Sequence, residues 1–307
     1  MIVAAGLTPA WQQIARFDEF RLGEVNRAAE VVWCASGKVL NVGRALAALG
    51  ADGRTVSPCG PSHRDAMKAD MNSLGAKVRW IDSAAETRVC TTILDARSGA
   101  TTELVENARA LSADEISAAG DAFEHEAEAA DLVVLTGSLP AGAPVTFYRD
   151  LLSRCHTRAI LDVRGPELIE ALAARPFVVK PNREELARTV GRDLLDEPDV
   201  IEAARSLTDR GVTWVVVSHG KAGVAIVSAE AAYRCQPPVV DPIVNPIGSG
   251  DSLAAALAWA IDDGKEFLEA MRLAVGAASH NVGQLLPAAL SAGEVRRLAA
   301  QVTIERV

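Results

Sequence analysis

Apolar residues along the chain gather into short continuous runs, and each run is followed by turn residues and then by a helical pattern. Continuous apolar runs of this length are typical of parallel strands that are buried on both faces of a sheet. The strands predicted in this way are residues 2–5, 132–135, 159–161, 177–179 and 214–217.

Between these runs, apolar residues recur at helical spacing, as Val39, Val42 and Leu46 do. Alternating strands and helices predict an α/β fold with a mostly parallel central sheet and helices on both of its faces. The predicted helices are residues 38–49, 65–74, 113–129, 145–155, 199–210 and 252–262.

Two early regions break this alternation. Residues 14–34 are strand-like without helical periodicity, and residues 88–105 predict a β-hairpin. We expect both to join one small sheet outside the main domain, where a lid or a dimer contact are its natural uses. This assigns residues 1–10, 36–86 and 106–307 to the α/β domain, and residues 11–35 and 87–105 to a β-sheet lid.

The composition of the chain argues against some classes of function, namely binding of nucleic acid and insertion into membranes. The chain has 307 residues and a formal net charge of −9, and it contains no run rich in Lys or Arg, so nucleic acid is not the expected partner. Its apolar stretches are too short to span a bilayer, and its first residues do not resemble a signal peptide. Its five cysteines are scattered. We therefore expect a cytoplasmic enzyme with free thiols and no membrane contact.

The strongest chemical signal is Gly248–Asp251, which leads directly into a predicted helix. Two glycines one residue apart point backbone N–H groups and the positive end of the helix dipole at one spot, which suits the charge of a transferring phosphoryl group. A carboxylate there repels phosphate unless it is needed to take a proton from an attacking hydroxyl. A simple helix cap preceded by a glycine turn is the structural alternative.

Residues 245–251 resemble the glycine-rich signature of the ribokinase-like, PfkB family of carbohydrate kinases, with Ser249 in place of alanine. Residues 35–46 resemble the family's other signature, in a form most similar to the branch of 1-phosphofructokinase and tagatose-6-phosphate kinase. Further stretches follow in the family's order, at residues 86–88, 137–140, 180–185 and 218–220. The resemblance covers residues 1 to about 290. It implies an ATP-dependent kinase with a ribokinase-like fold, and a homodimer that pairs through the lid.

The resemblance also assigns roles to individual residues. Asp251 would be the catalytic base, and Gly248, Ser249 and Gly250 would supply the N–H groups of an anion hole. Asn182 and Glu185 would hold Mg²⁺ through water, since Mg²⁺ prefers oxygen ligands and retains its waters. The same pair also fits a capping box. The remaining expected nucleotide contacts are Lys180, Ser218, Gly220, Gly223, Gly250 and Asn281.

On the acceptor side, the family pattern points to Gln12, Gly37, Lys38, Asn41, Arg88 and Ser138 together with Asp251. Lys38 and Arg88 are of most interest, because an acceptor that is already phosphorylated needs cations around its phosphate. A lysine in the first turn of a helix also opposes the helix dipole, which favours a functional role for Lys38.

Two departures from the family pattern leave the acceptor open. Gln12 stands at or next to the position where the phosphosugar branch has aspartate, and Arg164 stands where it has serine. The preferred function is phosphorylation of a hydroxyl on a sugar phosphate. A kinase of an unphosphorylated sugar or nucleoside is the first alternative, and a non-catalytic sugar- or nucleotide-binding regulator is the second. An NAD-dependent oxidoreductase is disfavoured, because no glycine-rich turn follows the first strand.

Overall fold

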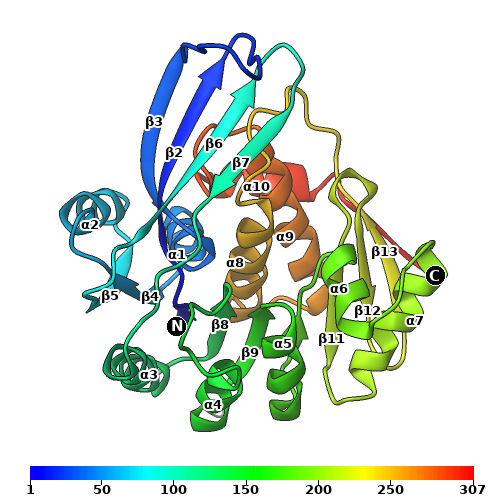
Figure 1. Ribbon diagram of the computed structural model, residues 1–307. Helices are drawn as coiled ribbons and strands as arrows, with labels where there is room; N and C mark the ends of the chain where they lie inside the picture. The colour runs from blue at the N-terminus through cyan, green and yellow to red at the C-terminus, as the bar shows by residue number, and fades with distance from the viewer. Residues whose placement is uncertain (156) are drawn as a thin grey trace.

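The computed structural model describes residues 1–155 and 157–307, and its centre is a large sheet with helices on both faces (Figure 1). Within the described part of the chain this sheet has ten strands, in the order β14-β13-β12-β11-β10-β9-β8-β1-β4-β5. The strands from β5 to β11 are parallel, and β12 to β14 add an antiparallel edge. Their bounds are β1 Ile2–Ala5, β4 Gly53–Cys59, β5 Lys77–Asp82, β8 Leu132–Thr136, β9 Arg158–Asp162, β10 Val178–Val179, β11 Trp214–Ser218, β12 Val224–Val227, β13 Ala232–Gln236 and β14 Thr303–Arg306.

The central strands are apolar throughout because both of their faces are covered. Ile2 and Ala4 of β1 belong to the core under α1, α8 and α9, whereas Val3 and Ala5 face the core under α3 to α7. Helix α2 packs near the edge strand β5, and α10 packs against α9. The helices are α1 Lys38–Ala48, α2 Arg64–Ser73, α3 Ala113–Ala127, α4 Phe147–Arg154, α5 Pro166–Ala171, α6 Arg183–Val190, α7 Glu197–Thr208, α8 Ser249–Asp262, α9 Phe267–Val282 and α10 Ala292–Ala299.

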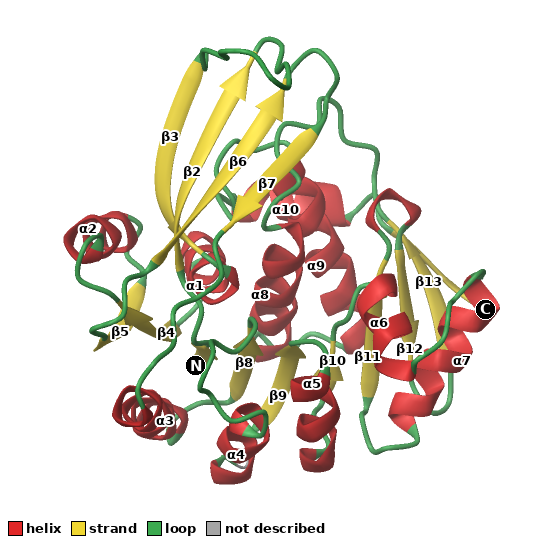
Figure 2. Ribbon diagram, viewed as in Figure 1, coloured by secondary structure: helices red, strands yellow, loops and turns green. Residues whose placement is uncertain are grey.

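Four strands form a separate small sheet that stands apart from the large one (Figure 2). They are β2 Ala10–Phe17, β3 Glu30–Ser36, β6 Arg88–Asp95 and β7 Thr101–Val105, in the order β3-β2-β6-β7. The central pair, β2 and β6, is parallel, and the outer pairs are antiparallel. These strands come from the two regions in which the sequence breaks its strand–helix alternation.

The two faces of the small sheet differ. Ile14, Cys34 and Leu94 are buried on the inner face, where they pack against Leu285 and Leu286, which follow α9. The outer face exposes the apolar side chains of Val31, Trp33 and Leu104. Among the described residues no helix has the length and apolar character that crossing a membrane requires.

Candidate active site

Asp251 lies in the first turn of α8 and is buried, with 6% of its surface exposed. Its Oδ2 accepts a hydrogen bond from Nδ2 of Asn41 at 2.7 Å. Asn41 is itself buried in α1, and its Oδ1 accepts a hydrogen bond from Ser36 Oγ at 3.0 Å. The amide of Asn41 is therefore held at both ends, and it fixes the orientation of the carboxylate of Asp251.

Two lysines and a second carboxylate gather beside Asp251. Asp162 ends β9 and is 1% exposed, and its Oδ1 lies 2.9 Å from Nζ of Lys38 and 3.1 Å from Nζ of Lys180. The carboxyl ends of neighbouring parallel strands meet at one edge of a sheet. Asp162, at the end of β9, and Lys180, which follows β10, therefore come together there. The cluster thus holds two ammonium groups next to the buried carboxylate of Asp251.

Burial and these charges set the protonation of the cluster. Burial raises the pKa of Asp251 to about 6, although the ammonium of Lys38 acts in the opposite direction. Burial would also raise the pKa of Asp162, but Lys180 and Lys38 together outweigh it and hold that pKa below its ordinary value. Burial would lower the pKa of Lys38, but Asp162, Asp251 and Glu185 raise it. Near neutral pH the site therefore holds a charged Lys38 beside a carboxylate poised to accept a proton.

The turn before α8 places backbone beside these charges. Gly248 has φ 84°, and a Cβ added there would lie 2.7 Å from Cβ of Pro287, so only glycine fits. Helical hydrogen bonding begins with Ser252 N–H, which donates to Gly248 O at 2.8 Å, and this leaves the earlier first-turn N–H groups for other acceptors. Ser249 N–H donates to Pro246 O at 3.3 Å. The remaining candidate donors for an anion are therefore the N–H groups of Gly248 and Gly250. A Cβ on Gly250 would lie 3.3 Å from Nζ of Lys180, so the ammonium stands directly over this backbone.

The other acceptor-side residues meet around the start of α1. Gly37 has φ 87°, and an added Cβ would lie only 2.7 Å from Thr8 O. Thr8 in turn donates from Oγ1 to Ser138 O at 3.1 Å. The structure therefore brings Gly37 and Ser138 together across Thr8, next to Lys38.

Gln12 and Arg88 both lie at the small sheet, where their polar atoms already have partners. Gln12 is 4% exposed, and its Nε2 donates to Thr92 Oγ1 at 2.6 Å. The guanidinium of Arg88 donates to Thr8 O at 3.0 Å, and more weakly to the carbonyls of Pro9 and Glu106. Arg88 must exchange some of these bonds if it is to bind a phosphate.

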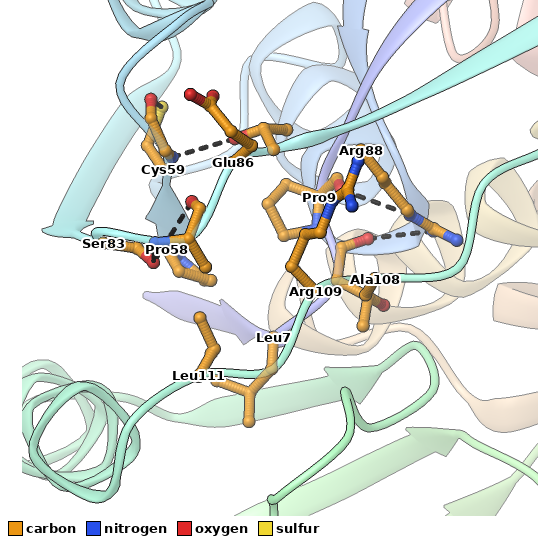
Figure 3. Close-up of a pocket in the computed structure, with 14 residues that line it drawn as sticks. Leu7, Pro9, Pro58, Cys59, Ser83, Glu86, Arg88, Ala108, Arg109 and Leu111 are labelled. Atoms are coloured by element: carbon orange, nitrogen blue, oxygen red, sulfur yellow. Dashed lines mark hydrogen bonds between the residues drawn. The ribbon is translucent and has the colours of Figure 1, made fainter.

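Arg88 also lines a cavity at the base of the small sheet, together with Arg109, Leu7 and Leu111 (Figure 3). The cavity has a volume of about 20 Å³, which is enough for a water molecule and too little for a sugar. It is therefore too small to be the binding site of a sugar.

The expected nucleotide and metal residues lie at the ends of β10 and β11. Asn182 and Glu185 form a capping box at the start of α6: Asn182 Oδ1 accepts from Glu185 N at 2.8 Å, and Glu185 Oε2 accepts from Asn182 N at 3.0 Å. Asn182 also forms a bridge with Ser218, which places Ser218 beside it. Gly220 and Gly223 bound the turn from β11 to β12. Arg164 Nη1 lies 3.9 Å from Glu185 Oε1.

Asn281 is fully buried and lines no open surface. Its Nδ2 donates to Ile247 O at 2.9 Å and to Ser249 Oγ at 3.1 Å, while its Oδ1 accepts from Ala288 N at 2.7 Å. The structure thus brings Asn281 to the glycine turn, and its amide is engaged within the protein on every side.

The family model for pfkB family carbohydrate kinases matches residues 1–291. The chain belongs to this family. Its neighbours among solved structures include Escherichia coli phosphofructokinase-2 in complex with substrates and products, with a TM-score of 0.89, 26% sequence identity and 98% coverage of both chains. Another is a possible 1-phosphofructokinase from Thermotoga maritima, with a TM-score of 0.90, 18% identity and coverage of 100% of this chain and 99% of that one. The chain is a carbohydrate kinase with the mostly parallel sheet and small second sheet expected from its sequence.

Two residues of this PfkB-family kinase were not singled out by the sequence: one lies in the cluster beside Asp251, and the other is exposed on the inner face of the small sheet. Asp162 was not among the residues that the sequence assigned to the site, but it anchors both lysines. Glu103 pairs in register with Thr92, which pairs with Ile14, so Glu103 shares the inner face with Gln12. A polar residue at the end of a buried strand was the available signal for Asp162, whereas nothing in the local sequence marked Glu103.

Proposed function

We propose that this kinase transfers the γ-phosphoryl group of ATP to a hydroxyl of a sugar phosphate. The observation that carries the proposal is the buried carboxylate of Asp251, held by Asn41 beside two lysines and a glycine turn. Asp251 takes the proton of the acceptor hydroxyl as its oxygen attacks phosphorus. Its raised pKa makes this transfer favourable near neutral pH.

The residues around Asp251 stabilise the charge of the transferring group. The ammonium groups of Lys38 and Lys180 stand close to the backbone of the first turn of α8, whose N–H groups supply further donors. Gly248 and Gly250 keep this surface free of side chains. Donors that are fixed before the reaction stabilise developing charge without reorganisation, so phosphoryl transfer here depends on position and charge.

Asn182 and Glu185 fit a magnesium ion bound through water. Both offer oxygen atoms, and Glu185 is close enough to raise the pKa of Lys38, which places it at the same edge of the sheet. The capping box bonds use Oδ1 of Asn182 and Oε2 of Glu185, so Oε1 of Glu185, which lies 3.9 Å from Nη1 of Arg164, is the oxygen left to accept a hydrogen bond from water. When bound, Mg²⁺ would neutralise phosphate charge, while these residues orient its waters.

Two arguments support a phosphorylated acceptor. Lys38 and Arg88 are cations on the acceptor side of Asp251, as phosphate binding requires. The E. coli phosphofructokinase-2, at 26% identity over 98% of the chain, has a structure in complex with fructose-6-phosphate. We place Gln12, Gly37, Asn41 and Ser138 around the sugar, with its phosphate toward Arg88.

One observation favours the alternative, an unphosphorylated sugar. Glu103 lies on the inner face of the small sheet, and its pKa is raised because the surrounding protein reduces its hydration, although Arg88 acts in the opposite direction. A carboxylate there repels a phosphate and accepts hydrogen bonds from hydroxyl groups. Lys38 is also already paired with Asp162. The two acceptor classes are separated by the experiment below.

We further propose that the small sheet is a lid over the sugar and that its outer face pairs with a second copy of this chain in the cytoplasm. Trp33, stacked on Trp11 at 5.9 Å between ring centroids, is 43% exposed on that face, and Val31 of β3 and Leu104 of β7 are exposed on the same face. Exposed apolar side chains that share one face of a sheet are typical of an interface. The five cysteines are free, as expected in a reducing compartment.

The test is ADP release that depends on ATP and magnesium, measured across phosphorylated and free sugars. The panel holds fructose 1-phosphate, fructose 6-phosphate, tagatose 6-phosphate, ribose, fructose and adenosine, with Asp251→Asn as the control. Turnover of a phosphosugar that the variant loses supports the proposal. Turnover of free sugars alone supports the alternative, and turnover of none with equal background in both proteins would exclude this acceptor range.

A further inference from the structure

Two buried asparagines brace the turn that precedes α8. Asn281 donates to Ile247 O and Ser249 Oγ and accepts from Ser252 Oγ at 3.2 Å, so it contacts the turn on both sides of Gly248. Asn245 accepts from Ile247 N at 3.0 Å and donates to Leu285 O at 2.8 Å. Neither side chain reaches solvent. Their amides therefore replace water as the partners of this turn.

Both asparagines connect the turn to one segment, residues 283–288, which we call the strap. Asn245 reaches the strap at Leu285, and Asn281 reaches it at Ala288, whose N–H donates to Oδ1 of Asn281. Pro287 of the strap is in direct contact with Gly248, since a Cβ on that glycine would lie 2.7 Å from Cβ of Pro287. The turn and the strap are thus one hydrogen-bonded and packed unit.

The other side of the strap touches the small sheet. Leu285 and Leu286 pack against Ile14, Cys34 and Leu94 on its inner face. That face also carries Gln12, on the acceptor side of the site. The strap therefore connects the inner face of the small sheet to the glycine turn, through the packing of the two leucines and the hydrogen bonds of the two asparagines.

We propose that Asn281 is a positioning residue, which fixes the N–H groups at the start of α8 and makes their position depend on the small sheet through the strap. The inference rests on the proposed function of that turn as an anion hole. Acceptor contacts at the small sheet and phosphoryl stabilisation at α8 are then energetically coupled, and the coupling is reciprocal. Asn281 itself contacts neither substrate.

Asn281→Asp tests the brace, because it keeps the shape and the acceptor oxygen but replaces the donor with a carboxylate that faces two oxygen atoms. We expect kcat to fall about a hundredfold, the size of the loss of one oxyanion-hole donor, while the acceptor Kd measured without nucleotide stays within about twofold. Asn72→Asp, at an exposed asparagine of α2, is the matched control and should change neither quantity. Equal loss of kcat and of acceptor binding in Asn281→Asp would overturn the proposal.

Leu286→Ala tests the connection to the small sheet with both asparagines in place. In the wild-type protein the acceptor should bind more tightly when a non-hydrolysable ATP analogue is present, and this ratio should approach one in Leu286→Ala and in Asn281→Asp. An unchanged ratio in both would overturn the coupling. Amide hydrogen exchange of residues 244–253, measured without substrates, should be faster in Asn281→Asp. This readout separates failure of the brace from failure of the kinase assignment, because it does not need catalysis.

Discussion

The Nδ2 atom of Asn41 lies 2.7 Å from the Oδ2 atom of Asp251, although 210 positions separate the two residues in the chain. The bond stabilises the charged form of Asp251 and so opposes the effect of burial on its pKa. It also joins α1, which carries the acceptor-side residues, to α8, which begins at the glycine turn. One hydrogen bond thus helps to set both the protonation and the orientation of the Asp251 carboxylate.

The pH dependence of turnover should report Asp251. The base must be deprotonated and its pKa is about 6, so kcat/KM for the acceptor should be level above pH 7 and fall as the pH drops through 6. Asp251→Asn should reduce kcat by about 10²-fold or more, as is typical for loss of a positioned base. A steady-state profile from pH 5 to 9 checks both, and near-normal turnover of Asp251→Asn would contradict the assigned role.

Lys38 should influence the pH at which the acidic limb of this profile lies. Its ammonium is the largest influence that lowers the pKa of Asp251, so Lys38→Met should move the acidic limb of the profile to higher pH and reduce kcat. Lys38→Arg keeps the positive charge and is the matched control, with a limb close to that of the wild type. A limb that stays in place in Lys38→Met would show that the lysine does not act on Asp251.

The ionised carboxylate of Asp251 should also lower the stability of the folded protein at neutral pH. The Asp251 carboxyl binds its proton more tightly in the folded protein than in the unfolded chain. The resulting loss of folding stability is therefore absent below pH 3.8 and complete above pH 6. A shift from 3.8 to about 6 corresponds to about 3 kcal/mol in the free energy of unfolding. Urea unfolding of Asp251→Asn should therefore show a gain of up to about that size at pH 8 and a smaller one at pH 5. A gain that is larger at pH 5 than at pH 8 would refute this.

Local sequence pattern was enough for the central parallel strands and most of the helices, because strands that are buried on both faces are apolar throughout. It did not reveal β4, in which Ser57 and Pro58 interrupt the apolar residues, β5, or the antiparallel edge from β12 to β14, and it missed helices α5, α6, α9 and α10. The role of Asp162 depends on which strands are neighbours, which is a long-range property. The family pattern placed Asn281 at the nucleotide, and only its burial and bonds show that it braces the turn.

Glu103 should discriminate between acceptors. If its carboxylate faces the sugar, Glu103→Gln should lower KM for a phosphosugar relative to the corresponding free sugar by about fivefold, the upper end for a partly hydrated charge pair. Glu24→Gln, at an exposed site in the loop between β2 and β3, is the control. Initial rates with paired free and phosphorylated sugars measure the ratio. If the ratio of the two KM values is the same in the wild type, in Glu103→Gln and in Glu24→Gln, Glu103 does not belong to the acceptor site.

Trp33 should hold two copies of the chain together. Replacing it with glutamate places a charge on the apolar outer face of the small sheet, and burying an unpaired charge costs more than a small interface supplies. Trp33→Glu should therefore sediment as a monomer at concentrations where the wild-type protein is a dimer. Leu195→Glu, at a leucine that is 82% exposed and lies between α6 and α7, should leave the dimer intact. A wild-type protein that sediments as a monomer at all concentrations would exclude the pairing, and a dimer that survives Trp33→Glu would place the interface on another face.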